Sequence, residues 1–169
     1  MNETHFNPTI LCSNESFLFY ASNKYPSIRV HNQDSQLETI LIGDSSGIST
    51  LFANSNYLFS GTLAKNIFGW ELSTFSLCYH IQHTDIITAF FFSNFQINGK
   101  KHLFLFVGSQ DHKISAYDLS FSFLIFEIQL ESNLIPIKIN MNLTQLLTVI
   151  CSNTETTPPT QMVITYSFE

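Results

Sequence analysis

The sequence carries little charge. Only 12% of its 169 residues are Asp, Glu, Lys or Arg, against roughly 25% in an average soluble domain. Seven Lys and Arg face thirteen Asp and Glu, which gives a formal net charge of −6. So few basic residues, scattered along the chain, cannot assemble the positive face that binds a phosphate backbone. The composition therefore excludes an electrostatic nucleic-acid binder.

Cysteine is also scarce. The three cysteines, Cys12, Cys78 and Cys151, are far apart and odd in number. They form neither a disulfide framework nor the paired spacing of a zinc knuckle. This usage favours a reducing intracellular compartment, and we expect a cytoplasmic protein.

Long apolar runs are missing. Runs such as Leu103 to Val107 and Phe123 to Phe126 are far shorter than the roughly 20 residues that span a bilayer. Met1 to Thr4 has neither the basic nor the apolar region of a signal peptide. We therefore expect no membrane span. Hydrophobic residues nevertheless make up 44% of the chain and include 17 Phe, so the chain can form a core and is not disordered.

What the sequence does contain is a series of short runs rich in Ile, Val, Phe, Tyr and Thr. Each run has the length of a strand, and turn formers such as Gly43 to Gly47 and Asn54 to Asn56 lie between them. No stretch of twelve residues keeps an apolar stripe at helical spacing. The pattern predicts an all-β chain of about fourteen or fifteen short strands. The predicted strands are residues 17–20, 27–31, 37–42, 48–52, 57–60, 67–72, 77–81, 86–93, 103–107, 114–119, 123–130, 135–140, 146–151 and 162–168.

The predicted strands recur in register. Residues 43–52 align with 82–91, and 58–72 then align with 106–119 in the same order. Equivalent positions fall at His31, Trp70, Tyr117 and Tyr166, a period of about 40–50 residues that is typical of a propeller blade. We predict one partial propeller over residues 1–169, with four-stranded blades at approximately 9–42, 48–81, 86–130 and 135–168.

The stretch from Gln82 to Leu119 resembles a WD repeat. In that family a Gly-His pair opens the unit, an Asp lies in the turn between the second and third strands, and a Trp-Asp pair closes the unit. Gln82 replaces the opening Gly, and Tyr117 replaces the Trp. The positions that carry the structural resemblance here and in the preceding unit are Ser60, Trp70, His83, Asp111, Tyr117 and Asp118.

The resemblance implies how two of the blades are held. His83 is expected to donate a hydrogen bond to Asp111, which would fix the loop before residue 86. In the preceding blade Asp44 replaces the His and Ala64 replaces the turn Asp. That blade is therefore expected to lack the polar lock and to rely on apolar packing.

WD-like propellers are non-catalytic scaffolds for protein partners, so the resemblance implies no enzyme activity and no cofactor. Their contacts lie on the loop into each first strand and on the turn between the second and third strands. These places select six candidate partner-binding residues: Tyr25, Asp44, Lys65, Asp85, His112 and Lys113.

About four blades leave two blade faces uncovered, because WD-type rings have more blades. The last blade is expected to stop after its third strand, which leaves an open sheet edge. Three arrangements would cover the faces: a homodimer that closes an eight-bladed ring, a longer propeller, or another protein.

Two alternative functions remain open. Cys78, His80, His83 and Asp85 are close in sequence and could serve a metal-binding or hydrolytic protein. The heptapeptide from Asn94 to Lys100 resembles a stretch in propellers that follow BEACH domains, which act in vesicle trafficking, and is expected to lie in an inserted loop. Ser109, Asp111 and His112 are not expected to form a catalytic relay, because adjacent residues of a turn point apart.

Overall fold

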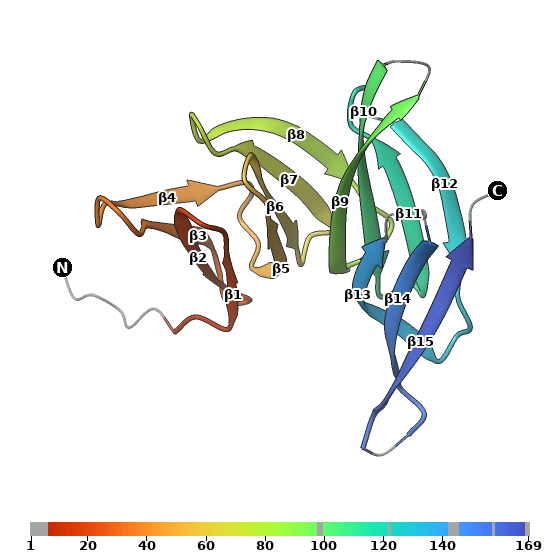
Figure 1. Cartoon of the computed structure of the whole chain (residues 1–169). Helices are drawn as coiled ribbons and strands as arrows, with labels where there is room; N and C mark the ends of the chain where they lie inside the picture. Colours follow the sequence, from red (N-terminus) through yellow and green to blue (C-terminus); the bar gives the residue numbers. More distant parts are fainter. Residues whose placement is uncertain (1–6, 98–99, 122, 142–145, 157, 168–169) are drawn as a thin grey trace. The chain divides into compact units, whose positions relative to one another are not determined.

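The computed structural model describes residues 7–97, 100–121, 123–141, 146–156 and 158–167 (Figure 1). Within this part of the chain the backbone forms fifteen β-strands and no helix. The predicted all-β class is confirmed. There is likewise no apolar helix of membrane-spanning length among the described residues.

Each sheet is a meander in which neighbouring strands are consecutive in the chain and antiparallel. The first sheet contains β1 (Ile10–Ser13), β2 (Phe17–Ser22), β3 (Tyr25–Asn32) and β4 (Glu38–Ile42). The second sheet contains β5 (Ile48–Ala53), β6 (Tyr57–Thr62), β7 (Asn66–Glu71) and β8 (Ser76–Gln82). The third sheet contains β9 (Ile87–Ile97), β10 (Lys100–Ser109), β11 (Lys113–Asp118) and β12 (Phe123–Gln129). The fourth contains β13 (Leu134–Met141), β14 (Leu146–Asn153) and β15 (Thr160–Ser167).

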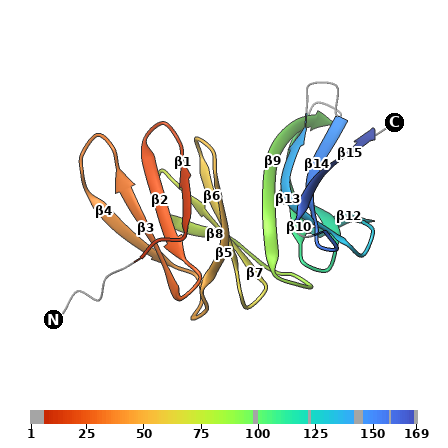
Figure 2. The same ribbon diagram turned by 90° about the horizontal axis from the view of Figure 1, so that it is seen from below.

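The chain divides into two compact units, residues 1–86 and 87–169, and each unit holds two sheets. In the first unit, strand alternation turns Phe19 and Ala21 of β2 toward a core that also contains Leu58 and Trp70 of the second sheet. β1 lies beside β5 at this junction (Figure 2). Apolar packing between the two sheets therefore holds the first unit together.

The second unit repeats this arrangement. Ile114 and Ala116 of β11 share a core with Leu147 and Val149 of β14, and β13 lies beside β9 and β10. The Thr88 hydroxyl donates a hydrogen bond to the Pro136 carbonyl across the two sheets. The first strands of the two sheets are thus linked by polar as well as apolar contacts.

The structure corrects the expectation of an inserted loop at residues 94–101. β9 continues to Ile97 and β10 begins at Lys100, with Gln96 opposite Lys101 and Asn94 opposite Leu103. The segment is an extension of a β-hairpin, and only residues 98–99 of it lie outside the described part. The reason is visible in the sequence, because Asn98-Gly99 is a strong hairpin-turn pair and lies between the two runs predicted as strands, residues 86–93 and 103–107.

The four repeat positions occupy equivalent places in the third strands. His31 in β3 lies opposite Leu18, and Trp70 in β7 lies opposite Leu58. Tyr117 in β11 and Tyr166 in β15 lie opposite leucines of β10 and β14 in the same way. The register of the sheets therefore gives a residue-by-residue equivalence between all four.

Candidate functional site

Lys65 forms the corner of the turn between β6 and β7. Its backbone is in the left-handed region, with φ of 67°, and its amide donates to the Thr62 carbonyl. Its carbonyl accepts a hydrogen bond of 2.8 Å from the His83 amide, so the turn is tied to the loop that leaves β8. The turn is therefore fixed by main-chain bonds on both sides.

The Lys65 side chain reaches the same loop. Its Nζ lies 3.0 Å from Asp85 Oδ1 and donates to the Thr84 carbonyl at 3.2 Å. Asp85 Oδ1 also accepts from the Ile86 amide at 2.9 Å. Two of the six candidate partner-binding residues therefore bind each other, and their side chains remain 45% and 29% exposed.

Asp44 lies at the centre of a hydrogen-bond network in the loop between β4 and β5. Its Oδ1 accepts from the amide and the hydroxyl of Ser46, both at 2.8 Å. Its Oδ2 accepts from Thr62 Oγ1 at 3.0 Å and from Asn66 Nδ2 at 2.9 Å. Asn66 Oδ1 in turn lies 3.3 Å from His80 Nε2.

This network corrects the expectation that the second sheet lacks a polar lock. The loop before β5 is tied to the β6–β7 turn by a carboxylate in the place of the usual His, and the donors are Thr62 and Asn66 rather than residue 64. Burial acts to raise the pKa of Asp44, but the hydrogen bonds from Asn66, Ser46 and Thr62 outweigh it and lower the pKa below 3.8. Asp44 is ionised at neutral pH, which strengthens each of these bonds.

Tyr25 begins β3, and its side chain is 39% exposed. The preceding turn approaches the loop before β5 so closely that a Cβ on Gly47 would lie 1.9 Å from the Asn23 carbonyl oxygen. Only glycine allows this approach. The backbone contact therefore sets the position of Tyr25 relative to the Asp44 loop.

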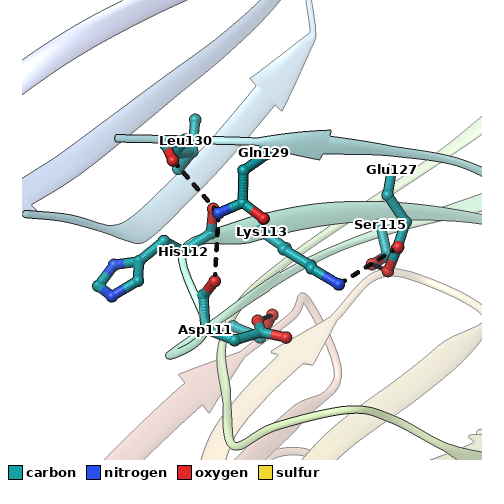
Figure 3. A network of polar contacts seen from close by, with 8 residues as sticks. Asp111, His112, Lys113, Ser115, Glu127, Gln129 and Leu130 are labelled. Carbon is teal, nitrogen blue, oxygen red and sulfur yellow. Dashed lines mark hydrogen bonds and ion pairs between the residues drawn. The ribbon is translucent and has the colours of Figure 1, made fainter. Parts of the chain in front are cut away.

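In the second unit the turn between β10 and β11 holds His112 and Lys113. His112 has φ of 63°, its Nδ1 donates to the Leu134 carbonyl at 3.1 Å, and its own carbonyl accepts from the Leu130 amide at 2.8 Å. Figure 3 shows the Gln129 amide beside the same turn, where its Nε2 donates to the carbonyls of Asp111 and His112. Lys113 and Ser115 both bind the Glu127 carboxylate.

The turns of the two units are equivalent. Lys65 and His112 both have positive φ, and each accepts a main-chain bond from the residue 18 positions later, His83 and Leu130. Gln82 donates to the first turn as Gln129 does to the second. We use the term turn surface for the candidate turn residues of each unit taken by itself, which are Tyr25, Asp44, Lys65 and Asp85 in the first unit and His112 and Lys113 in the second. Their role in partner binding remains a prediction.

The structural repeat positions are mostly buried. Trp70, Tyr117, His83 and Asp118 are at most 7% exposed, and Ser60 is fully buried. The Ser60 hydroxyl has no hydrogen-bond partner within the described residues. The expected bond between His83 and Asp111 would join the two compact units and remains a prediction.

Sequence reasoning missed the partner of Asp118. Asp118 Oδ2 accepts a hydrogen bond of 2.8 Å from His102 Nδ1, and its Oδ1 accepts from the Ser120 amide. Burial acts to raise the pKa of Asp118, but the bonds from His102 and Ser120 outweigh it and lower the pKa. The His102 ring stacks on Phe104 at a centroid distance of 6.0 Å. The register, which places Phe104 opposite Asp118, was the missing signal.

The suspected metal ligands are not gathered into a site. Cys78 Sγ lies 3.4 Å from the Ser76 carbonyl, whereas the His80 ring stacks on Phe68 at 4.7 Å. Asp85 is paired with Lys65. Within the described residues there is no group of three or more His, Cys, Asp or Glu placed to hold a metal ion.

Comparison with solved structures identifies the fold. The chain is similar over its whole length to the computationally designed Ika4 protein, with a TM-score of 0.75 and 15% identity, and covers 96% of that chain. It is also similar over 95% of its length to U3-55K (TM-score 0.71, 16% identity) and to the RRP9 WD40 repeats (TM-score 0.70, 15% identity). The chain spans about half the length of these two, 52% and 51%.

No protein-family model and no curated protein matches the sequence, so the likeness is one of fold. Designed propellers and WD40 repeat structures share the arrangement of successive antiparallel sheets found here. The chain is an all-β partial propeller, and its described residues form four sheets with four, four, four and three strands.

Proposed function

We propose that the chain is a non-catalytic scaffold that binds another protein through the turn surface. The observation that carries the proposal is the matched pair of turns, each fixed by main-chain bonds at Lys65 and His112. A rigid turn loses little conformational freedom on binding, so its exposed side chains can contribute their contacts without an ordering cost. The likeness to WD40 repeat structures supports the same role.

The charges of the turn surface favour a protein partner. Lys65 and Lys113 are basic, whereas Asp44 and Asp85 are acidic, so neither sign dominates. A polyanion such as nucleic acid requires a basic face. A mixed surface with an exposed Tyr25 is typical of a protein–protein contact.

The described residues offer no support for catalysis. The Ser109 hydroxyl donates to Asp111 at 2.5 Å, whereas His112 donates to the Leu134 carbonyl, so the three side chains do not form a Ser-His-Asp relay. The metal-binding alternative lacks a cluster in this part of the chain. The trafficking alternative rests on the sequence of the heptapeptide at 94–100 alone. Of this heptapeptide, residues 94–97 lie in β9 and residue 100 lies in β10. The three free cysteines agree with a reducing, cytoplasmic location.

The test compares two double variants of the full chain as bait in extracts of the source cells. The turn variant carries Tyr25→Ala and Lys113→Ala. The matched control carries Phe123→Ala and Lys101→Ala, which remove an exposed aromatic ring and an exposed amine away from these turns. Both baits are first checked for an unchanged melting temperature, and the recovered proteins are quantified by mass spectrometry.

At least one protein should be recovered by the wild type and the control but fall about tenfold with the turn variant, since losing two contacts of about 0.7 kcal/mol each changes affinity by that factor. Purified partner and chain should then reproduce the difference by calorimetry. Equal recovery by both variants for every protein would overturn the turn surface as the binding site.

A further inference from the structure

The second strand of each of the four sheets carries a leucine at an equivalent position, and we call these four residues the leucine column. Leu18, Leu58, Leu105 and Leu147 lie opposite the equivalent positions 31, 70, 117 and 166. Three of them are fully buried at 0% exposure, whereas Leu18 is 37% exposed. The same residue in the same place is therefore buried in every sheet except the first.

A second column points to the opposite face. We call it the isoleucine column. It lies in the third strands, three residues before positions 31, 70, 117 and 166, and contains Ile28, Ile67, Ile114 and Val163. The three isoleucines are at 0% exposure, whereas Val163 is 64% exposed. This column is therefore buried in every sheet except the last.

The two columns are the two halves of one kind of sheet–sheet contact. In the first unit Leu58 packs in the same core as Ile28 of the preceding sheet. In the second unit Leu147 packs in the same core as Ile114. A leucine-column face therefore fits an isoleucine-column face. The first sheet offers an uncovered face of the former kind, and the last sheet offers one of the latter.

We propose that a second copy of this chain covers both faces, with the first sheet of each copy on the last sheet of the other. Two equivalent head-to-tail contacts between a first and a last sheet then form, and both uncovered faces are buried. The similar solved structures include one chain of this length and one about twice as long, because this chain covers 96% of the designed Ika4 protein and 47% of the computationally designed Ika8 protein.

The composition of the faces suits burial. Leu11, Ile40 and Ile42 extend the apolar area of the first sheet beside Leu18. The Tyr20 hydroxyl on this face already donates to Glu38 at 2.6 Å, so its burial would not strand an unpaired donor. The exposed Lys138 of β13 offers the charge opposite to Glu38. A patch of this kind on a soluble protein is typically covered by a partner.

The test measures the mass of the full chain by size exclusion with light scattering over a dilution series. The wild type should elute as a dimer of twice 19.3 kDa. Leu18→Glu and Val163→Lys should each raise the dimer dissociation constant more than about hundredfold, because each buries an unpaired charge. The double variant should recover at least about tenfold of that loss, because the two charges then face each other.

The control is Leu37→Glu, which changes an exposed leucine in the turn before β4 and should leave the dimer intact. Circular dichroism and the melting temperature confirm that each variant is folded. A folded monomer at every wild-type concentration overturns the proposal and assigns the faces to another chain or segment. A ladder of larger masses overturns it too, because the contact would then be open-ended. Neither result depends on the turn surface or its partner.

Discussion

The hydrogen-bond network of Asp44 predicts a measurable loss in the free energy of unfolding when its carboxylate is removed. In Asp44→Ala the fully buried Thr62 hydroxyl loses its acceptor, which costs about 1–2 kcal/mol. The side-chain donors of Asn66 and Ser46 bind water instead of the carboxylate in the variant. Because the loop is half-exposed, losing these two hydrogen bonds lowers the free energy of unfolding by about 1 kcal/mol more. The free energy of unfolding should therefore fall by about 2–3 kcal/mol, and the melting temperature by roughly 5–10 °C.

The assay is urea unfolding followed by tryptophan fluorescence. The chain has one tryptophan, Trp70, which is 3% exposed and packs in the core of the first unit. The signal therefore reports the unit that contains Asp44. Asp34→Ala, which removes an exposed carboxylate from the β3–β4 turn, is the matched control and should change stability by less than about 0.5 kcal/mol.

The pH dependence follows from the pKa of Asp44, which is lower in the folded chain than its usual 3.8. A carboxyl with a lowered folded pKa contributes its full stability above the unfolded value and loses it as the pH falls through the folded value. The difference between wild type and Asp44→Ala should thus be constant from neutral pH to about 5 and shrink below about 4. A loss of less than about 0.5 kcal/mol at neutral pH, or one that does not shrink in acid, would refute the reasoning.

Three further predictions concern single positions. Ser60→Ala removes a buried hydroxyl without a partner in the described residues and should leave stability unchanged or raised by up to about 1 kcal/mol in the same fluorescence assay. Gly47→Ala should cost more than about 2 kcal/mol or prevent soluble expression, because its Cβ would overlap the Asn23 carbonyl; a wild-type melting temperature would contradict this. Asp118→Asn should lower thermal stability by about 2–3 kcal/mol, since it leaves His102 without its carboxylate, and histidine NMR resonances should shift for His102; unchanged resonances would contradict the pairing.

Much of the fold was predictable from the sequence because strands and turns leave local patterns. β6 and β7 are almost continuously buried and lie where the sequence predicts strands at residues 57–60 and 67–72. β1 was not among the predicted strands, although its burial alternates along its four residues. The β9–β10 extension was assigned to a loop because the spacing of the repeat was weighted above the Asn98-Gly99 hairpin signal.

The polar contacts were harder to predict, because they depend on register. His102 and Asp118 come together only when β10 and β11 pair in the observed alignment. The Asp44 network uses Thr62 and Asn66, two residues that the family resemblance does not single out. When one residue of the family's hydrogen-bond network is substituted, a residue two positions away can supply the donor instead. A comparison with the family's motif then counts the network as absent, although its hydrogen bonds are formed.

Every sheet in this chain is built from strands that follow one another directly. Contacts between near neighbours close short loops, which form within microseconds and require little chain entropy to be lost at once. Each meander can therefore assemble as soon as its last strand leaves the ribosome, before the next one has been synthesised. Slow steps in refolding should come from docking of finished sheets rather than from strand pairing.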